Sequence, residues 1–166
     1  MKTFIAITVI FAGFTAAAEA PPLPATDITA TDIQAFLKAL PRDKVSDLPI
    51  RTVDVGGYHI GIFGVLRPKS VRQEANLHQT KVTEVYQILD GAGTLVTGGT
   101  LIDAHPMAPG STNIQGTGIQ GGVSRRVSRG DMIIIPGYTP HYFSNIESDL
   151  TYTITRPDPA GVLKLK

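Results

Sequence analysis

Hydrophobic residues recur with two different periods along the chain, a helical one before residue 41 and a strand-like one after residue 50. The helical period is carried by Ile33, Phe36, Leu37 and Leu40. Thr31 and Gln34 fit a capping box at the start of this segment, and Pro41 ends it. We therefore expect one short amphipathic helix that packs on the outside of the domain.

From Ile50 onward, short apolar runs alternate with turn residues, a pattern typical of strands. The predicted strands are Ile50–Val55, Tyr58–Leu66, Val82–Leu89, Thr94–Thr97, Thr100–Ile102, Val123–Val127, Met132–Ile135, His141–Ser144 and Leu150–Thr155. Turns are expected at Gly56-Gly57, Asp90-Gly91 and Gly98-Gly99. This series of short strands without a second helix predicts an all-β sandwich or barrel.

The segment from His105 to Gly122 differs from its surroundings, because it is rich in Gly, Pro, Ser and Thr. Structureless loops of this length in compact domains are usually either binding loops and lids or disordered segments. We expect no regular structure here, and both interpretations stay open.

The first 20 residues have the pattern of a secretory signal peptide. Lys2 precedes the apolar run Thr3–Phe14, and Ala16 to Ala18 offer a cleavage site. The alternative is an uncleaved N-terminal anchor. Cleavage after Ala18 would leave a periplasmic or secreted protein without a stable membrane anchor. We expect three segments: signal peptide 1–18, Pro-rich leader and helix 19–45, and β-barrel domain 46–166.

Composition narrows the function classes. A length of 166 residues corresponds to one domain. Lys and Arg total 15 against 14 Asp and Glu, so no basic excess points to nucleic acid. The absence of cysteine excludes disulfides, a thiolate nucleophile and Cys-ligated metals.

The sequence contains four histidines, and each is a candidate metal ligand. If the strand were continuous from His78 to Tyr86, His78 and Glu84 would share one face and form half of a metal site. His141, on a later strand, can supply a third ligand. His59 faces either the barrel interior, where it can serve as a further metal ligand, or a structural partner. His105 is expected to be exposed. On residue chemistry alone, structural roles remain the more common explanation.

Two blocks of the sequence resemble the motifs of the cupin superfamily. His78-x5-Glu84-x6-Gly91 is similar to the first motif, G-x5-H-x-H-x3–4-E-x6-G. Gly130-x5-Pro136-x4-His141-x3-Asn145 is similar to the second, G-x5-P-x-G-x2-H-x3-N. This resemblance implies a cupin-type double-stranded β-helix, a jelly-roll barrel, with His78, Glu84 and His141 as metal ligands.

The sequence departs from these motifs at three positions. Arg72 stands in place of the first glycine, and Tyr138 in place of the second motif's central glycine, with Gly137 one position earlier. Thr80 stands in place of the second histidine and removes one of the usual four ligands. Either a water held by Thr80 fills that position, or the protein has lost the metal.

The resemblance implies one divalent transition metal per chain, with Fe, Mn, Zn, Ni and Cu all compatible. Two histidines and one carboxylate leave open positions on a non-haem Fe(II) for oxygen and substrate. We therefore expect a dioxygenase-like oxidoreductase acting on a small organic molecule. The alternatives are a non-redox lyase or isomerase, or a non-catalytic metal- or ligand-binding protein, so whether the chain is an enzyme stays open. The resemblance also implies a homodimer.

Further residues near the motifs carry weaker signals. Candidates for orienting the ligands are Tyr86, Gln87, Tyr142 and Asn145, each more commonly a packing or turn residue. A G-x-G-x-x-G match at residues 116–121 lacks a following helix, so a nucleotide site is not expected. Arg125, Arg126 and Arg129 suit either an anionic substrate or a solvated strand face.

Overall fold

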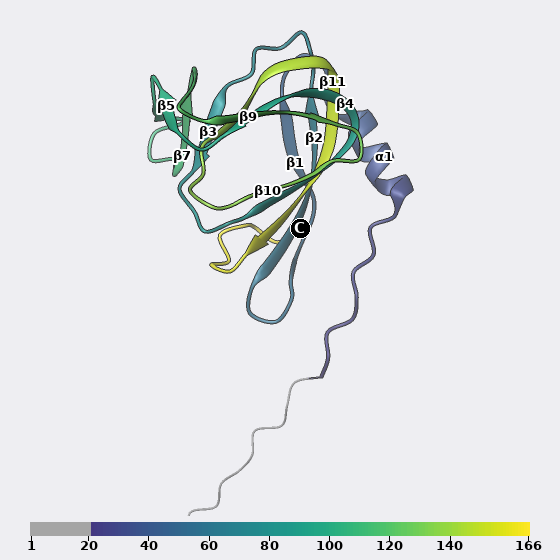
Figure 1. Ribbon diagram of the computed structural model, residues 1–166. Coiled ribbons are helices and arrows are strands. Elements are labelled where there is room, and N and C mark those ends of the chain that lie inside the picture. Colours follow the sequence, from purple (N-terminus) through teal and green to yellow (C-terminus); the bar gives the residue numbers. More distant parts are fainter. Residues whose placement is uncertain (1–20) are drawn as a thin grey trace, which may run out of the picture.

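The computed structural model describes residues 21–166, so the expected signal peptide lies outside the described residues. The elements are α1 (Ala30–Ala39), β1 (Ser46–Asp54), β2 (His59–Arg67), β3 (Ala75–His78), β4 (Glu84–Thr97), β5 (Thr100–Ile102), β6 (His105–Pro106), β7 (Asn113–Gly116), β8 (Gly118–Gln120), β9 (Val123–Ser128), β10 (Met132–Ile135) and β11 (His141–Asp158). The all-β class with one short helix is confirmed (Figure 1).

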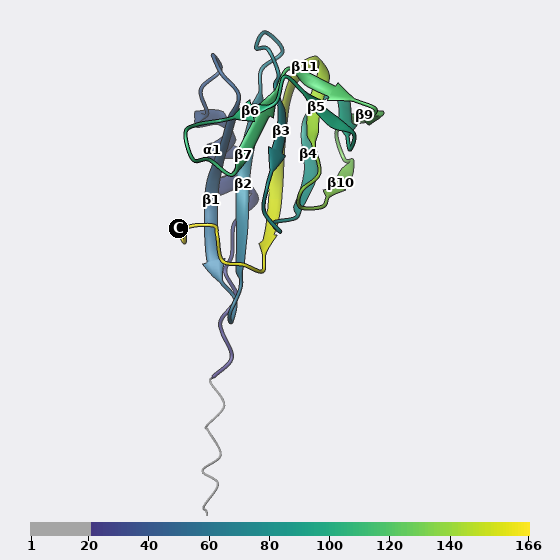
Figure 2. The same cartoon turned by 90° about the vertical axis from the view of Figure 1, so that its left-hand side faces the viewer.

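A nine-stranded antiparallel sheet folds into two facing sheets that form the barrel, and β4 and β11 take part in both; β5 and β8 form a separate two-stranded sheet. The second half of β11 lies between β2 and the first half of β4, in the order β1-β2-β11-β4-β10. The start of β11 lies between β3 and the second half of β4, in the order β6-β7-β3-β11-β4-β9. Figure 2 shows these long strands from the side. The arrangement is the double-stranded β-barrel that the motifs predicted.

Several predicted strands are parts of longer ones. The turn expected at Asp90-Gly91 is wrong, because β4 continues through it to Thr97. Gly91 has a φ of 83°, and the pairing of β4 with β11 shifts register near this point. A glycine-containing irregularity therefore bends the strand from one sheet into the other without ending it. The strands predicted at His141–Ser144 and Leu150–Thr155 likewise merge into β11.

The segment 105–122 is not structureless, which corrects the expectation. It contains β6, β7 and β8. Strand β7 pairs with both β3 and β6, and β8 pairs with β5. Composition alone obscured these strands because each has at most four residues. Pairing with β3 places β7 directly beside His78.

The helix lies outside the barrel, as expected, but its predicted cap is wrong. Thr29 is the N-cap, and its hydroxyl accepts from the Asp32 backbone N–H while Asp32 reciprocates, so the capping box is Thr29 and Asp32 instead of Thr31 and Gln34. Phe36 packs against β2 at Gly64, where a Cβ atom would overlap its ring. No helix among the described residues is long and apolar enough to cross a membrane.

The core lies between the two sheets. Its most deeply buried members are Val65, Tyr86, Ile88, Leu95, Phe143, Leu150, Tyr152 and Ile154. Strands β4 and β11 supply most of them. Residues two positions apart on a strand share a face. Glu84 lies two positions before Tyr86 and His141 two before Phe143, so the polar site is on the same inner wall as the core.

Candidate metal centre

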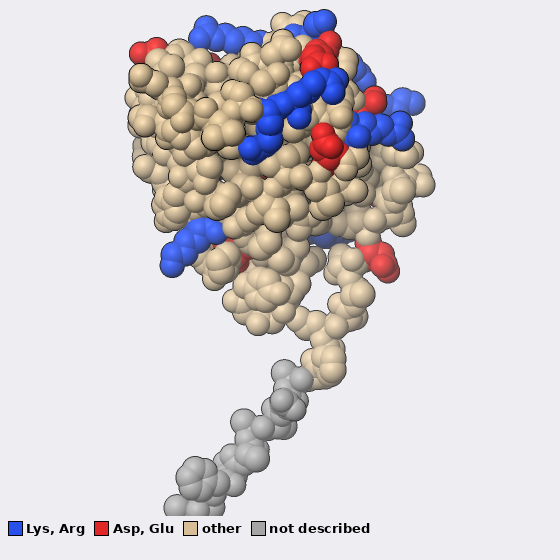
Figure 3. All heavy atoms as spheres, in the orientation of Figure 1, with Lys and Arg blue, Asp and Glu red and all other residues tan. Residues whose placement is uncertain are grey.

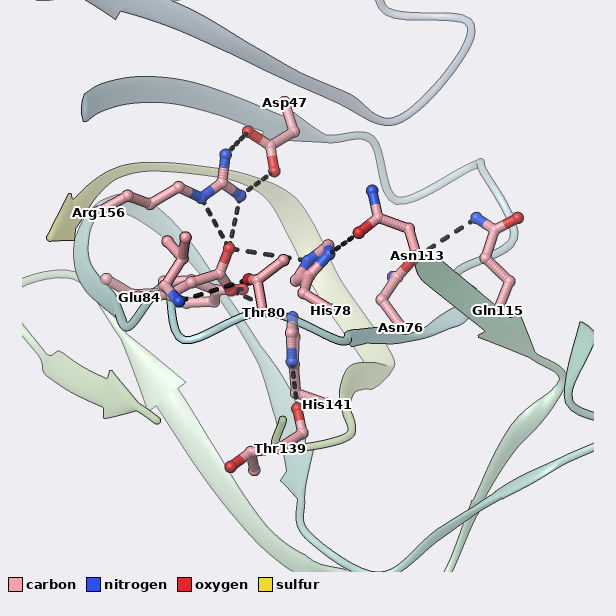
Figure 4. Close-up of polar contacts among 12 residues, drawn as sticks. Asp47, Asn76, His78, Thr80, Glu84, Asn113, Gln115, Thr139, His141 and Arg156 are labelled. Atoms are coloured by element: carbon pink, nitrogen blue, oxygen red, sulfur yellow. Dashed lines mark hydrogen bonds and ion pairs between the residues drawn. The ribbon is translucent and has the colours of Figure 1, made fainter. Parts of the chain in front are cut away.

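The structure brings His78, Glu84 and His141 together on the inner wall of the barrel (Figure 4). One ligand atom from each residue lies within 4.8 Å of the others. His78 ends β3, Glu84 begins β4 and His141 begins β11. The three residues predicted from the motif spacing therefore form one cluster from three strands.

The route by which His78 and Glu84 meet differs from the prediction of one continuous strand. Residues 79–83 leave the sheet, so the two side chains belong to different strands. The turn before β11 packs against this segment, because the Tyr138 N–H donates to the His78 carbonyl over 3.3 Å. Gly137 lies directly against Thr80 and Lys81. These contacts place His141 beside His78.

Hydrogen bonds fix the orientation of both imidazole rings. Nδ1 of His141 lies 2.9 Å from the Thr139 carbonyl oxygen, and Nδ1 of His78 lies 2.9 Å from Oδ1 of Asn113. Both partners are acceptors, so Nδ1 carries the hydrogen in each ring. The Nε2 atoms of the neutral rings then carry lone pairs, and both face Glu84.

The Nε2 atoms of both histidines lie close to the carboxylate oxygens of Glu84. Nε2 of His141 lies 3.2 Å from Oε2 of Glu84, and Nε2 of His78 lies 3.8 Å from Oε1. Burial lowers the pKa of His141, although the Glu84 charge opposes this effect. A neutral imidazole nitrogen and a carboxylate oxygen at this distance repel each other unless a proton or a metal ion lies between them. The donor set therefore fits a divalent metal ion.

Glu84 is anchored by neighbours that the sequence analysis missed, apart from Tyr86. The Arg156 Nε donates to Oε1 over 2.8 Å, and the Tyr86 hydroxyl donates to Oε2 over 3.0 Å. Both Arg156 Nη atoms donate to Asp47, at 3.1 and 2.6 Å. Arg156 thus binds two carboxylates at once, and Oε2 of Glu84 is the oxygen that faces His141.

These neighbours also set the charge state of the carboxyl group. Burial raises the pKa of Glu84, but the charge of Arg156, the histidines His141 and His78 when they are protonated, and the hydrogen bond from Arg156 outweigh this effect and bring it to about 2. Burial and the Glu84 charge raise the pKa of Tyr86 well above its ordinary value. At neutral pH, Glu84 is therefore an anion and Tyr86 a hydrogen-bond donor.

Two cavities meet at the cluster. One, of about 510 Å³, is lined by Arg67, Tyr86, His78 and His141, and we call it the Arg67 cavity. The other, of about 740 Å³, is lined by Thr80, Glu84, His78 and Arg156 and reaches the C-terminal segment at Leu163. His78, Asp47 and Met107 line both. A ligand can therefore approach the cluster from either side.

The remaining candidate residues lie elsewhere. His59 is outside the cluster, with Nδ1 2.8 Å from the Leu163 carbonyl oxygen, which is a structural role. His105 is exposed, as expected. Thr80 lines the second cavity, and its hydroxyl accepts from the Val82 N–H over 3.4 Å. Gln87 and Asn145 are exposed.

The weaker motifs form no site in the structure. Strand β8 lies within the glycine-rich segment 116–121 and β9 follows it, where a nucleotide fingerprint needs a helix. Arg126 forms an exposed two-pronged ion pair with Glu147, and Arg125 bonds Thr97. Figure 3 shows basic and acidic side chains interspersed on one face, with no continuous basic surface there.

The chain resembles known proteins in its structure and not detectably in its sequence. No protein-family model matches the chain, and no curated protein matches its sequence. The structure is similar to the DMSP lyase DddQ from Ruegeria pomeroyi DSS-3, at 14% identity and a TM-score of 0.49, covering 92% of this chain and 84% of that one. It is similar to an RmlC-like cupin family protein from Methanocaldococcus jannaschii, at 14% identity and a TM-score of 0.43, covering 72% and 88%. An oxalate oxidase bound to the substrate analogue glycolate has 14% identity and a TM-score of 0.48, with coverage of 73% and 54%.

The classification rests on the chain's own topology and site. Two sheets share β4 and β11 around one core. The residues of the two motif blocks, far apart in sequence, meet at a group of side chains able to hold a metal ion. The described residues form one domain with the double-stranded β-helix, a jelly-roll barrel, that the resemblance of the two motif blocks to the cupin superfamily implies.

Proposed function

We propose that the protein is a divalent-metal-dependent enzyme of the oxygenase type that acts on a small organic molecule. One observation carries the metal: both histidines donate from Nδ1 to an acceptor, which leaves both Nε2 lone pairs facing the Glu84 carboxylate. Protein sites prepare imidazole for metal ligation in this way. His78, Glu84 and His141 would hold the ion.

The chain's own residues prepare the site for chemistry. Arg156 and Tyr86 hold the Glu84 carboxylate in place by hydrogen bonds. The barrel wall buries Glu84 and His141, which are 3% exposed each, so few waters compete with a substrate. Asn113 and Thr139 keep a hydrogen on each Nδ1.

Three protein ligands favour catalysis over pure metal storage. When bound, a divalent ion at this set supplies Lewis acidity and, as Fe(II), open positions for oxygen and a substrate. Thr80 contributes no fourth ligand among the described contacts, and two cavities reach the cluster. A non-redox lyase or isomerase would use the same three residues, and the identity of the bound metal separates the two classes.

The metal proposal is tested by elemental analysis of the untagged mature protein. We expect about one equivalent of divalent transition metal per chain, lost in His141→Ala. His105→Ala is the matched control, because His105 is exposed and outside the cluster. Circular dichroism of each variant verifies that the fold is retained.

The outcomes separate the alternatives. Fe together with oxygen consumption on a panel of small organic molecules supports the oxygenase type. If the protein contains Zn or Ni and its turnover continues without oxygen, a lyase or isomerase replaces the oxygenase as the proposed class. No metal after reconstitution, in a folded wild-type protein, overturns the enzyme proposal and leaves a metal-free binding protein.

The location and assembly of the protein extend this proposal. The signal-peptide pattern of residues 1–18 supports a periplasmic or secreted mature chain. The motif resemblance supports a homodimer. The mass of the exported protein and its sedimentation test these two points independently of the metal.

A further inference from the structure

Arg67 is a buried cation that the proposed metal site does not use. It ends β2 and is 6% exposed. Its Nε donates to the Tyr152 hydroxyl over 2.8 Å, and Nη1 donates to Oε1 of Gln73 over 2.9 Å. Its guanidinium also lies 5.3 Å from the centre of the Phe143 ring. Both hydrogen-bond partners are neutral, so none of these contacts neutralises the charge.

No carboxylate of residues 21–166 forms an ion pair with Arg67. The candidate inside the same cavity is Asp47, but both of its oxygens accept from Arg156. Glu84 is also bound to Arg156. A buried charge without a counter-ion is costly, and proteins rarely retain one without a partner. A partner from outside the described chain would supply the missing negative charge.

Arg67 lines a cavity of suitable size for a small ligand. Nη2 of Arg67 has no hydrogen bond to residues 21–166, and Nη1 has one N–H to spare. These two nitrogens form the fork that matches the two oxygens of a carboxylate. The Arg67 cavity, about 510 Å³, is also lined by His78, His141 and Tyr86. An anion held by Arg67 would therefore lie in the same space as the metal ligands.

The charges around the cavity favour an anion once a metal is present. In the interior, the two positive charges of Arg67 and Arg156 equal in number the two negative charges of Asp47 and Glu84. A divalent ion held by Glu84 and two neutral histidines would therefore add net positive charge. The site is thus complementary to a negatively charged ligand.

We propose that Arg67 binds the carboxylate of a small organic acid and presents the rest of that molecule to the cluster of His78, Glu84 and His141. The acid is the substrate class of the proposed enzyme, and to that extent the inference rests on the proposed function. Binding of the carboxylate by Arg67 itself does not require turnover. It can therefore be measured without any assay of activity.

Binding of butyrate tests the proposal, with butyramide as the uncharged probe of the same size. Saturation-transfer NMR and calorimetry are run on the folded mature protein, both loaded with Zn and treated with chelator. We expect the zinc-loaded protein to bind butyrate at least about tenfold more tightly than butyramide, as for a charge-assisted pair. Arg67→Met should abolish this preference while retaining the metal content of the wild type. Arg67→Lys, which keeps the charge but lacks the fork, should retain only part of it.

Arg72→Met is the matched control, because Arg72 lines the same cavity outside the interior and should change butyrate affinity less than about twofold. Equal butyrate binding by wild type and a folded Arg67→Met overturns the proposal. Preference for inorganic phosphate over butyrate replaces the organic acid with a phosphate and also overturns it. Arg67-dependent butyrate binding by a folded protein that takes up no metal on reconstitution supports this inference while contradicting the proposed enzyme, so the two failures are distinguishable.

Discussion

Each histidine of the candidate metal centre is oriented by a single oxygen atom. For His141 this oxygen belongs to the backbone of Thr139. For His78 it is the side-chain oxygen of Asn113, on β7. The side-chain acceptor can be removed by substitution, and the backbone acceptor cannot. The two histidines therefore differ in how easily their orientation is lost.

Asn113→Leu removes the acceptor while keeping the size of the side chain. We expect metal affinity to fall about 10- to 100-fold, because the His78 ring loses the bond that fixes its orientation and tautomer. Competition with a chelating dye measures the affinity. Asn76→Leu is the control, since Asn76 pairs with His141 through the backbone, whereas its side chain has its hydrogen bonds with the Glu74 carbonyl oxygen and Gln115. Equal affinities of the Asn113 variant and the wild type would contradict the role assigned to Asn113.

At the scale of single residues, motif spacing predicted the cluster of His78, Glu84 and His141. It predicted few of the residues that form hydrogen bonds with this cluster. Asn113 lies in a segment whose composition carries no strand signal. Arg156 is 72 positions from Glu84 in sequence, and no local pattern relates such distant residues. Alternation does give a signal: Tyr152, Ile154 and Arg156 share one face of β11 and are all buried. Arginine on an inward face needs a polar partner, and Glu84 provides it.

At the scale of elements, the ligand cluster depends on two turns that pack against each other. One is residues 79–83 between β3 and β4, and the other is the turn of Gly137 and Tyr138 before β11. Gly137 has no room for a side chain, because a Cβ atom there would lie within 3.0 Å of Lys81 Cα and against the Thr80 carbonyl oxygen. The obstacle is backbone, which cannot rotate aside.

Gly137→Ala should therefore separate the two turns. We expect it to cost about 1–3 kcal/mol of stability, as overpacking does, and to weaken metal binding because His78 and Glu84 flank the displaced segment. Gly130→Ala is the control: Gly130 has a φ of 95° but no atom near its Cβ position. It should lose stability through turn strain with metal affinity unchanged. Denaturant unfolding and dye competition measure the two quantities. Intact metal affinity in Gly137→Ala would show that the turn contact does not position the ligands.

Local sequence predicted where strands exist better than where they continue. The strands Met132–Ile135 and Thr100–Ile102 are confirmed with the predicted bounds. The long strands β4 and β11 were each divided at a bend. Turn residues at a bend resemble those at a hairpin, and only pairing with neighbouring strands tells them apart. The short strands β6, β7 and β8 depend on the same tertiary pairing.

At the scale of the whole molecule, the Arg156 network links the site to overall stability. Arg156 joins Glu84 on β4 to Asp47 on β1 from its own place on β11. Three strands of one sheet are therefore held by one buried charge network. Such a network stabilises the fold only while its carboxylates are ionised.

The stability of the metal-free protein should consequently fall at acid pH. The pKa of Glu84 is lowered from 4.5 to about 2 in the fold. Its contribution is complete above about pH 4.5 and is lost as the pH falls towards 2, with a magnitude on the order of 3 kcal/mol. Urea unfolding of chelator-treated protein from pH 6 to pH 2 measures this loss.

Glu84→Gln should give a shallower pH profile than the wild type over this range, because the titrating group is gone. Glu74→Gln, at an exposed position of the cavity wall, should follow the wild-type profile. Parallel profiles for the wild type and Glu84→Gln would rule out Glu84 as a source of the acid sensitivity.

The all-β class and the single domain followed from hydrophobic patterning and length, and the barrel type from the order of the motifs. The closure of the barrel did not follow, because it depends on β11 pairing with β2 on one side and β4 on the other. Pairings over such separations are set by how side chains fill the common core and leave no local trace in the sequence.

Strand β11 is also the last strand in sequence among the described residues. It pairs with β2, β3 and β4 and supplies both His141 and Arg156. During translation, a nascent chain that ends before residue 141 has every other strand but lacks the one that joins β2 to β4. It can neither close the barrel nor assemble the metal ligands. The order of the strands therefore delays closure of the barrel until β11 itself has been made.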